Sequence, residues 1–577
     1  MSKRDSRNTV PTRQKQADIG AFIRDGLVFH RQGRWDEATR VYEAALRRNK
    51  DNFDLLNLTA TAHAHGGRFA KAVGLIGEAL RIRPQPASAY VAHGNLGYAL
   101  QQLRRLDEAL ASYDKAISLK SDYADAHFNR SLLLLLAGRF DEGWHGYEWR
   151  KKKKGPVGNR TFPRPLLAGL DDIDGKTVLV HAEQGLGDAI QFCRYARLLQ
   201  ERGAIVLLAP PRVLRRLFAS LGGGIRLVDP DQPDLSFDYH VPLMSLPLLL
   251  GTSLATIPAK APYLHADAED IARWRRRLGD KGLKIGICWQ GSPSNTGNAR
   301  RSFPVTCFAS LARQPGVRLI SLQKGDGTEQ LDALPRDMAV ETLGDFDAAG
   351  NAFVDTAAVM NCLDLVITSD TSVAHLAGAL GVPAWIALNH VPDWRWMLDR
   401  ADSPWYPSVR LFRQKAAGDW QGVFEEIERA LLERLRRAER TAASGAPRAP
   451  ISWGELIDKI TILEIKSQRL SDTGALAHVA TELPALSAIA SRVLRASAAV
   501  RSHKEALLRV NQTLWDIEDR IREKEANQAF DDEFIRLARS VYETNDRRAA
   551  LKRSINTLLR SELMEEKSYR DARHHPS

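Results

Sequence analysis

Two short segments of this chain combine glycines, carboxylates and hydroxyls at the junction of a strand and a helix. In the first, a β-branched and apolar run at 177–183 leads into Gly185-Leu-Gly-Asp188, and an apolar-periodic helix follows. Glycines at such a junction allow a tight turn and the close approach of a ligand to the backbone. The spacing is not G-x-G-x-x-G, so it does not support a dinucleotide fingerprint. Asp188 stands at the helix start, where Asp is favoured as a cap, so its role stays open at this point.

The second segment, Ser369-Asp370-Thr371-Ser372-Val-Ala-His375, also follows a predicted strand and opens a helix. The free N–H groups and the positive dipole end of a helix N-terminus bind phosphates, so a nucleotide diphosphate would fit there. Thr371 and Ser372 would add hydroxyl donors. His375, on the first turn, would donate to a phosphate unless it is a hydrogen-bonded core histidine. Asp370 would repel a phosphate, so we expect it to hold the turn or to bind ligand hydroxyls.

Basic and amide side chains follow two further predicted strands. Gln290 ends one strand, and the loop after it carries Arg300 and Arg301. A guanidinium binds phosphate through two parallel hydrogen bonds. Gln323 and Lys324 end the next strand and are expected to point toward the same cleft, unless they form a solvated strand terminus. These side chains are candidates for a phosphate clamp.

The elements that must position these residues alternate between strand and helix. After 177–183, strands are predicted at 204–208, 225–228 and 239–242, and a second set at 284–290, 317–323, 363–369, 383–388 and 409–413. Strands that alternate with helices favour parallel sheets. Two such sets, separated by a break near 261–280, predict two Rossmann-like lobes with a cleft between them.

A repeated pattern occupies the region before these strands. Ala38, Ala72 and Ala109 stand in register at intervals of 34 and 37 residues (38 to 72 and 72 to 109), and Gly143 takes the same place in a fourth copy. Small residues at fixed points with a period of about 34 residues are typical of tetratricopeptide helix pairs. Such pairs stack into a superhelix whose concave face binds other polypeptides.

Longer stretches around these motifs resemble a known family. They read HAEQGLGDAIQFCRYARLL, KIGICWQGSPSNTGNARRSFP, SLQKG, DLVITSDTSVAHLAGALGVPAW and PDWRWMLDRADSPWYP. Together they resemble bacterial tetratricopeptide proteins that carry a glycosyltransferase-like domain, similar to the lipopolysaccharide heptosyltransferases (family 9, GT-B fold). The resemblance covers residues 20–435.

This resemblance implies roles for several residues. Asp188 matches an aspartate that faces the cleft and acts as general base, taking a proton from the acceptor hydroxyl. Asp370, Thr371 and His375 match the family's donor-binding pattern D-[TS]-x-x-x-H, with Ser372 beside them, and Asp370 would bind sugar hydroxyls.

Further assignments follow the same resemblance less closely. Arg301, in Arg-Ser-Phe-Pro, matches a segment whose lysine touches a phosphate; Arg replaces Lys here, and Arg300 leaves the assignment open by one position. Trp394, in an aromatic and basic segment, would stack a nucleobase or sugar ring, although such residues more often pack lobe against lobe. The secondary candidates for the site are Gly187, Gln290, Gln323 and Trp394.

Two D-x-D triplets offer a metal-dependent alternative. They are Asp229-Pro-Asp231, which follows a predicted strand, and Asp172-Ile-Asp174. In metal-dependent (GT-A) glycosyltransferases such a triplet holds a divalent cation on the diphosphate. Both triplets stand in turn contexts, and two-lobed GT-B enzymes generally use helix dipoles and basic side chains instead. We therefore expect no metal and no cofactor, with the nucleotide-sugar as substrate.

Composition narrows the class of protein. At roughly 150 residues per domain, 577 residues predict several domains. Four cysteines without a C-x-x-C pair argue against a disulfide scaffold and a Cys-rich zinc site. The N-terminus lacks the apolar stretch of a secretory signal, and no apolar run approaches the ~18 residues of a membrane span, so we expect a soluble cytoplasmic protein. The net charge of +12 is spread along helical faces, so nucleic-acid binding is not expected.

The last part of the chain is predicted to be helical. A linker is expected at 441–450, and Ser452 and Glu455 form an S-x-x-E capping box before the next helix. Apolar residues at 507, 510, 514, 517 and 521 step by three and four, as in a coiled coil. The opening at 454–466 resembles a small bacterial helical domain of unknown role. We expect a bundle for oligomerisation or partner docking, with a possible homo-oligomer.

These patterns predict a multidomain chain. After a disordered N-terminus (1–18), an all-α tetratricopeptide superhelix (19–157) precedes an α/β GT-B unit with lobes at 165–262 and 283–438 and an α-helical bundle at 451–570. The expected activity is an inverting, metal-independent glycosyltransferase. Because peptide-binding repeats are fused to it, we expect a protein Ser or Thr as acceptor on the concave face; flagellin is suggested only by similar repeat-fused transferases. A glycolipid or surface-polysaccharide acceptor, and a non-catalytic repeat scaffold, are the alternatives.

Overall fold

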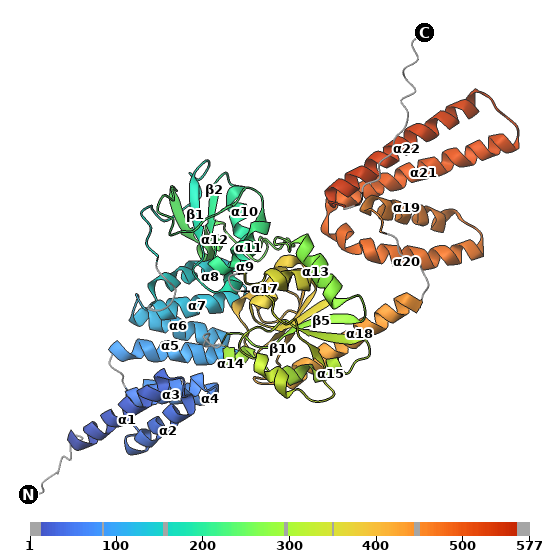
Figure 1. Cartoon of the computed structure of the whole chain (residues 1–577). Helices are drawn as coiled ribbons and strands as arrows, with labels where there is room; N and C mark the ends of the chain where they lie inside the picture. Colours follow the sequence, from blue (N-terminus) through green and yellow to red (C-terminus); the bar gives the residue numbers. More distant parts are fainter. Residues whose placement is uncertain are drawn as a thin grey trace, which may run out of the picture. The chain divides into compact units, whose positions relative to one another are not determined.

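The structure is a computed structural model that describes residues 13–82, 86–153, 160–292, 298–348, 351–443, 450–561 and 563 (Figure 1). Contacts divide the chain into two compact units, Met1–Arg436 and Arg437–Ser577. Helical repeats and two α/β lobes make up the first unit, and the second is helical. Within the described ranges, no helix is long and apolar enough to cross a membrane.

Stacked helix pairs open the first unit, which confirms the predicted repeats. Their bounds are α1 Arg13–Arg31, α2 Trp35–Arg48, α3 Phe53–His65, α4 Phe69–Arg81, α5 Pro86–Gln102, α6 Leu106–Leu119, α7 Ala124–Leu136 and α8 Phe140–Tyr147. Ala38, Ala72 and Ala109 are fully buried, because small residues let paired helices approach closely. Gly97 serves the same purpose: a Cβ there would lie 2.7 Å from the Tyr113 ring.

Two parallel sheets follow the repeats, as the alternating pattern predicted. The smaller has the order β3-β2-β1-β4, from β1 Thr177–His181, β2 Ile205–Ala209, β3 Arg226–Leu227 and β4 Tyr239–Pro242. The larger has the order β10-β9-β8-β5-β6-β7, from β5 Leu283–Cys288, β6 Val317–Ser321, β7 Val340–Glu341, β8 Leu365–Ser369, β9 Ala384–Leu388 and β10 Val409–Arg413. In each sheet the strand order reverses beside the first strand, β1 or β5, where ligands of open α/β sheets bind at the carboxyl edge. This is the two-lobed GT-B arrangement.

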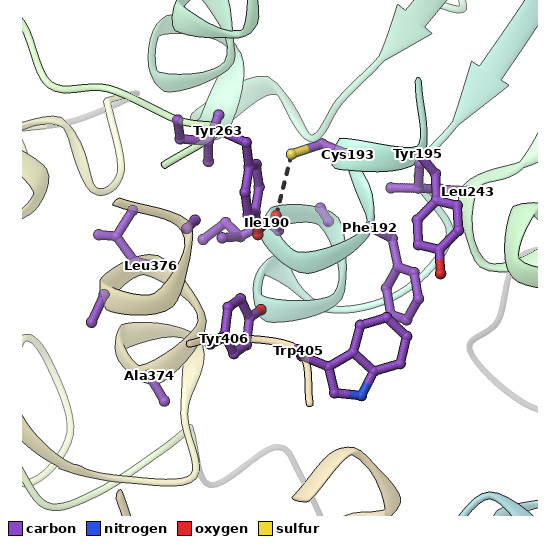
Figure 2. Packing of buried hydrophobic residues seen from close by; sticks show 14 of the residues in the cluster. Ile190, Phe192, Cys193, Tyr195, Leu243, Tyr263, Ala374, Leu376, Trp405 and Tyr406 are labelled. Carbon is purple, nitrogen blue, oxygen red and sulfur yellow. Dashed lines mark hydrogen bonds between the residues drawn. The ribbon is translucent and has the colours of Figure 1, made fainter. Parts of the chain in front are cut away.

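Helices cover and connect the two sheets. They are α9 Leu186–Phe192, α10 Arg194–Gln200, α11 Arg215–Phe218, α12 Leu246–Leu249, α13 Ala268–Leu278, α14 Asn298–Arg301, α15 Ala309–Ala312, α16 Val354–Met360, α17 Ser372–Leu380 and α18 Trp420–Ala443. One buried apolar cluster continues from the last repeat through both lobes. Figure 2 shows its centre, where Phe192 and Tyr195 of the first lobe lie near Trp405 and Tyr406 of the second. The later repeats and the lobes therefore share one core, whereas the first repeats have apolar clusters of their own.

The ends of the predicted segments differ from the structure in several places. Helix α1 begins at Arg13, inside the segment expected to be disordered, because RQKQA is a run of good helix formers. Helix α18 continues to Ala443, inside the expected linker, for the same reason. Helix α13 fills much of the predicted break, and the two-residue strand β7 was not predicted. Residues 1–12, 444–449 and 564–577 lie outside the described residues.

The second unit contains four long helices in its described part: α19 Trp453–Arg469, α20 Thr473–Ala496, α21 Ala498–Ala526 and α22 Asp532–Leu558. The Ser452 hydroxyl accepts from the Glu455 N–H at 3.2 Å, as the capping pattern predicted. Buried Asp458 accepts from the Arg548 guanidinium at 2.9 and 2.6 Å and from Asn511 at 2.8 Å. The polar residues of the 454–466 opening therefore hold helices α19, α21 and α22 together.

Candidate functional site

Asp188 is engaged on both of its carboxylate oxygens. It lies in the first turn of α9, directly after β1, and its Oδ2 accepts from the Gly185 N–H at 2.9 Å. Its Oδ1 accepts from Arg395 Nη2 of the other lobe at 2.5 Å. Burial raises the pKa of Asp188, while the positive charge of Arg395 acts in the opposite direction. Asp188 thus caps its helix and also pairs across the seam between the lobes.

Arg395 is the centre of the seam and was missed by the sequence analysis, which treated its neighbours as aromatic stacking candidates. Its Nε donates to Gln191 Oε1 at 2.5 Å, and its Nη1 donates to Asp393 Oδ1 at 2.9 Å. The Trp394 ring lies 4.3 Å from its guanidinium carbon. Although burial acts to lower the pKa of Arg395, Asp393 and Asp188 raise it overall. The available signal was an arginine between two tryptophans after β9, at the carboxyl edge of the larger sheet.

Asp370 and Arg301 line one cavity together with Asp393. Asp370 follows β8 and is only 6% exposed. Burial raises the pKa of Asp370 to about 6, the charge of Asp393 acts in the same direction, and Arg301 opposes both. Arg301 lies over Gly291, where a Cβ would stand 2.9 Å from its Nη2. Its buried Nε has no hydrogen-bond partner among the residues that the structure describes.

Arg300 points away from this cluster. Its Nη1 donates to the Tyr98 hydroxyl of the repeat helix α5 at 2.7 Å. The sequence left open which of the two adjacent arginines faces the cleft. Both arginines line the cavity; the guanidinium of Arg301 lies over Gly291, and that of Arg300 is bound by Tyr98 of the repeats.

The start of α17 is covered by the first lobe. A Cβ on Gly187 would lie 2.8 Å from His375 Cδ2 and 3.4 Å from Ser372 Cα. The Nδ1 of His375 shares a 2.9 Å hydrogen bond with the Tyr406 hydroxyl, and its ring stacks on Trp396 at 5.4 Å. Burial lowers the pKa of His375 well below its usual range, so the ring is neutral. His375 therefore has the environment of a hydrogen-bonded core histidine, which was the alternative to a phosphate donor.

Thr371 also points inward. Its hydroxyl lies 3.3 Å from the Thr368 hydroxyl and 3.9 Å from Cys288 Sγ. Thr371 and His375 therefore support the chain behind Asp370, and they do not line the cavity described below.

Gln323 and Gln290 hold the loops at the same edge of the sheet. Gln323 Oε1 accepts from the N–H groups of Trp289 and Gln290, both at 3.1 Å, and its Nε2 donates to the carbonyls of Gln290 and Asp326. Gln290 Oε1 in turn accepts from Gln330 at 3.2 Å. With these bonds made, both glutamines fix the backbone of the strand ends.

Lys324 is not brought together with Arg301. Its ammonium donates to the backbone carbonyls of Phe346 and Asp347. It lines a separate cavity of about 240 Å³ at the ends of β6 and β7. The proposed clamp of both cations around one phosphate does not form in this arrangement.

Trp394 packs against the last repeat. Its ring meets Trp144 edge-to-face at 5.2 Å and Tyr147 at 6.3 Å. The alternative expectation was that such residues pack lobe against lobe; the Trp394 ring lies 6.4 Å from Phe192 of the first lobe, but its shortest ring distance is to Trp144 of the last repeat. Trp394 nevertheless also lines the large cavity.

Arginines pair with both carboxylates of the Asp229 triplet. Asp229 pairs with Arg212 at 3.1 Å, and Asp231 pairs with Arg160. Within the described part of the chain, no group of three His, Cys, Asp or Glu side chains is placed to hold a metal ion.

A cavity of about 630 Å³ joins the repeats to the second lobe. Helices α3, α5 and α7 line one side with Thr61, His65, Asn95, Tyr98 and Asn129, among others. Loops at the carboxyl edge of the larger sheet line the other with Arg300, Arg301, Asp370, Asn389 and Asp393. Its volume falls in the range of about 300–1,000 Å³ that ligand sites occupy. The repeat surface and the charged cluster therefore face a single space.

Relatives of known sequence agree with this organisation. Protein FlbA of Caulobacter vibrioides is 30% identical over 429 residues, which are 69% of this chain and 70% of that protein. The chain belongs to the FlbA family. Photosystem I assembly protein Ycf3 of Synechococcus elongatus is 30% identical to this chain over 114 residues, which are 18% of this chain and 66% of Ycf3.

Models of three protein families match the helical parts of this chain. Residues 25–87 match "Tetratricopeptide repeat", 97–138 match "TPR repeat", and 448–577 match a family of unknown function, DUF6165. Among solved structures, E. coli ADP-heptose lps heptosyltransferase II is similar with a TM-score of 0.34 and 16% identity, covering 45% of this chain and 99% of that one. MamA is similar with a TM-score of 0.21 and 21% identity, covering 23% and 72%. Both likenesses concern the fold alone.

Proposed function

We propose that this chain is a glycosyltransferase that moves a sugar from a nucleotide-sugar to a Ser or Thr hydroxyl of a protein held by the repeats. The observation that carries the proposal is the shared cavity, which the concave side of the repeats and the carboxyl edge of the larger sheet line together. That edge, where the strand order reverses, is where open α/β sheets bind their ligands. A polypeptide in the repeat groove would present its hydroxyl to Asp370 and Arg301.

Arg301 is the proposed phosphate-binding group. Its buried Nε lacks a partner among the described residues, and an unpaired buried donor is costly unless a ligand accepts from it. Negative charge grows on the departing nucleotide diphosphate, and a fixed guanidinium stabilises that charge more in the transition state than in the substrate. Asp370 would accept hydrogen bonds from the sugar hydroxyls, with Thr371, Ser372 and His375 behind it as support.

Asp188 is the proposed general base. It would take the proton of the acceptor hydroxyl while that oxygen bonds to the anomeric carbon and the bond to the phosphate oxygen breaks, which inverts the carbon. Burial raises the pKa of Asp188, which makes it a stronger base, and Arg395 keeps it ionised. Its side chain is 23% exposed, so it remains accessible.

Asp370 is a second candidate for the base. It lines the cavity, whereas Asp188 does not, and its pKa of about 6 lies nearer to neutral pH. Transfer by Asp188→Asn and Asp370→Asn variants distinguishes the two: the base is the residue whose loss abolishes transfer while donor binding persists.

Donor binding and transfer test the proposal together. Thermal shifts of the full chain with a panel of nucleotide-sugars should identify a stabilising donor, and Arg301→Gln should lose that shift. Arg313→Gln, which removes an exposed partner of Asp337, is the matched control. Label from that donor should then enter protein. Label in lipid would select the glycolipid alternative, and a folded wild type that no donor stabilises would favour the non-catalytic scaffold.

A further inference from the structure

We propose that Tyr98, on the repeat helix α5, is a positioning residue of the transferase. Through Arg300 it sets the guanidinium of Arg301 at the wall of the cavity. The repeats are then part of the donor site as well as a surface for the acceptor. This inference rests on the proposed function, because it takes Arg301 as the group that meets the donor phosphate.

Tyr98 is a rigid anchor for Arg300. The 2.7 Å hydrogen bond from Arg300 to its hydroxyl joins residues 202 positions apart. The Tyr98 ring contacts Phe69 edge-to-face at 6.3 Å and His65 at 6.1 Å, so both helices of the preceding repeat hold it. The guanidinium carbon of Arg300 also lies 5.8 Å from the Tyr98 ring centre. A cation near an aromatic face adds attraction to the hydrogen bond.

The anchor acts on Arg301 because both arginines share one helical turn. Helix α14 spans only Asn298–Arg301, and neighbouring side chains on a helix point about 100° apart. With Arg300 fixed toward α5, Arg301 is directed over Gly291, at the wall of the cavity that Asp370 also lines. A single turn has no stability of its own, since helix nucleation is unfavourable. Bonds to the end of β5 also hold this turn, from the Gly291 N–H to the Ser302 hydroxyl at 3.4 Å and from the Phe303 N–H to the Trp289 carbonyl at 3.2 Å, and the contact with Tyr98 ties it to the repeats.

Tyr98 also belongs to the cavity wall. An occupant of the repeat groove would therefore touch the same side chain that holds Arg300. Binding at the groove and the placement of Arg301 are linked through one hydroxyl group.

Substitution of Tyr98 by phenylalanine tests this positioning role. Tyr98→Phe removes the hydroxyl and keeps the ring against Phe69. Tyr90→Phe is the matched control, because Tyr90 lies on the same helix and is not among the residues that line the cavity, while its ring is held by Tyr123 at 4.8 Å just as that of Tyr98 is held by its neighbours. The probe is inorganic pyrophosphate, which has the chemistry that all nucleotide diphosphates share. Titration calorimetry should show about three- to tenfold weaker binding for Tyr98→Phe, the loss expected for one ordinary hydrogen bond, and about unchanged binding for Tyr90→Phe.

Hydrogen exchange gives a readout that needs no ligand. Amides of residues 298–303 should exchange faster in Tyr98→Phe than in wild type and in Tyr90→Phe. Arg300→Leu should reproduce the loss, and the Tyr98→Phe/Arg300→Leu double variant should be no worse than Arg300→Leu alone. Additive losses would show that Tyr98 does not act through Arg300.

The outcomes separate this inference from the proposed function. Wild-type pyrophosphate binding and wild-type exchange in Tyr98→Phe would overturn the positioning role and leave the transferase proposal standing. A folded wild-type chain that binds no pyrophosphate would remove Arg301 as the phosphate group and overturn both. Thermal melting of each variant checks that it is folded.

Discussion

Arg395 Nη2 lies 2.5 Å from Asp188 Oδ1 and thereby joins two residues that are 207 positions apart. The same guanidinium also binds Gln191 and Asp393. One buried arginine therefore links the helix after β1 to the loop after β9, and it stands between the proposed base and the second lobe.

Loss of Arg395 should destabilise the first unit strongly. Arg395→Gln leaves the partly exposed carboxylates of Asp188 and Asp393 without their buried cation; breaking a fully buried pair costs about 3–5 kcal/mol, and partial exposure places this loss toward or below the lower end. Denaturant unfolding of the full chain measures the change. Arg105→Gln removes an exposed partner of Glu108 and should cost less than about 1 kcal/mol. Equal effects of the two variants would contradict a structural role for the seam.

The contact between α9 and α17 should not tolerate a methyl group. In Gly187→Ala the new Cβ meets His375 Cδ2 at 2.8 Å, so the two helices must separate, and overpacking of this kind costs about 1–3 kcal/mol. Gly169→Ala is the control, since nothing lies within 4 Å of a Cβ there. Thermal melting compares the two. An unchanged melting midpoint for Gly187→Ala would show that the lobes are loosely apposed.

The raised pKa of Asp370 predicts a pH-dependent stability. The folded protein holds the Asp370 proton up to a pKa of about 6, whereas the ordinary value is 3.8, so the folded state binds more protons between these pH values. This contribution is present at low pH and is lost as pH rises through that window. Asp370→Asn should therefore gain stability relative to wild type from about pH 3.8 to about pH 6 and keep a constant advantage above. Unfolding free energies across pH measure the difference, and a flat difference would show an ordinary pKa.

The side-chain amides of Asn95 and Asn129 should affect transfer to the acceptor and leave binding of the donor unchanged. Asn95 and Asn129 line the repeat side of the cavity. If they bind a polypeptide backbone, Asn95→Ala and Asn129→Ala should each lower transfer to a protein acceptor by about two- to tenfold, the value of one hydrogen bond. Thermal shifts with the donor should stay as in wild type. Asn49→Ala, in the turn after α2, is the control. Loss of donor binding in Asn95→Ala or Asn129→Ala would contradict separate roles for the repeats and the donor site.

The second unit offers a matched pair of glycines. Gly454 and Gly474 are each the second residue of a helix, α19 and α20. A Cβ on Gly454 would lie 2.6 Å from the Lys552 carbonyl, so Gly454→Ala should separate α19 from α22 and cost about 1–3 kcal/mol. Gly474→Ala meets only the end of the Asp472 side chain and should be neutral or slightly stabilising. Hydrogen exchange in α22 of the full chain reads out the difference.

Local patterns account for most of the correctly predicted fold. The repeats and most strands could be predicted because burial of one face of an element imposes a regular spacing on its apolar residues, and this spacing is visible over a short stretch of sequence. β7 has two residues and leaves no such pattern. The start of α1 at Arg13 lies in the segment that was expected to be disordered, although its residues RQKQA are good helix formers.

Within the site, the sequence by itself placed Asp188, Asp370 and Arg301 after strands, because the carboxyl ends of parallel strands share one edge. Only the tertiary structure decided which of them meet. It paired Asp188 with Arg395, covered His375 with α9, and turned Arg300 toward Tyr98 and Arg301 over Gly291. Contacts between residues hundreds of positions apart depend on how lobes and repeats pack, and that packing is a property of whole surfaces that no local spacing encodes.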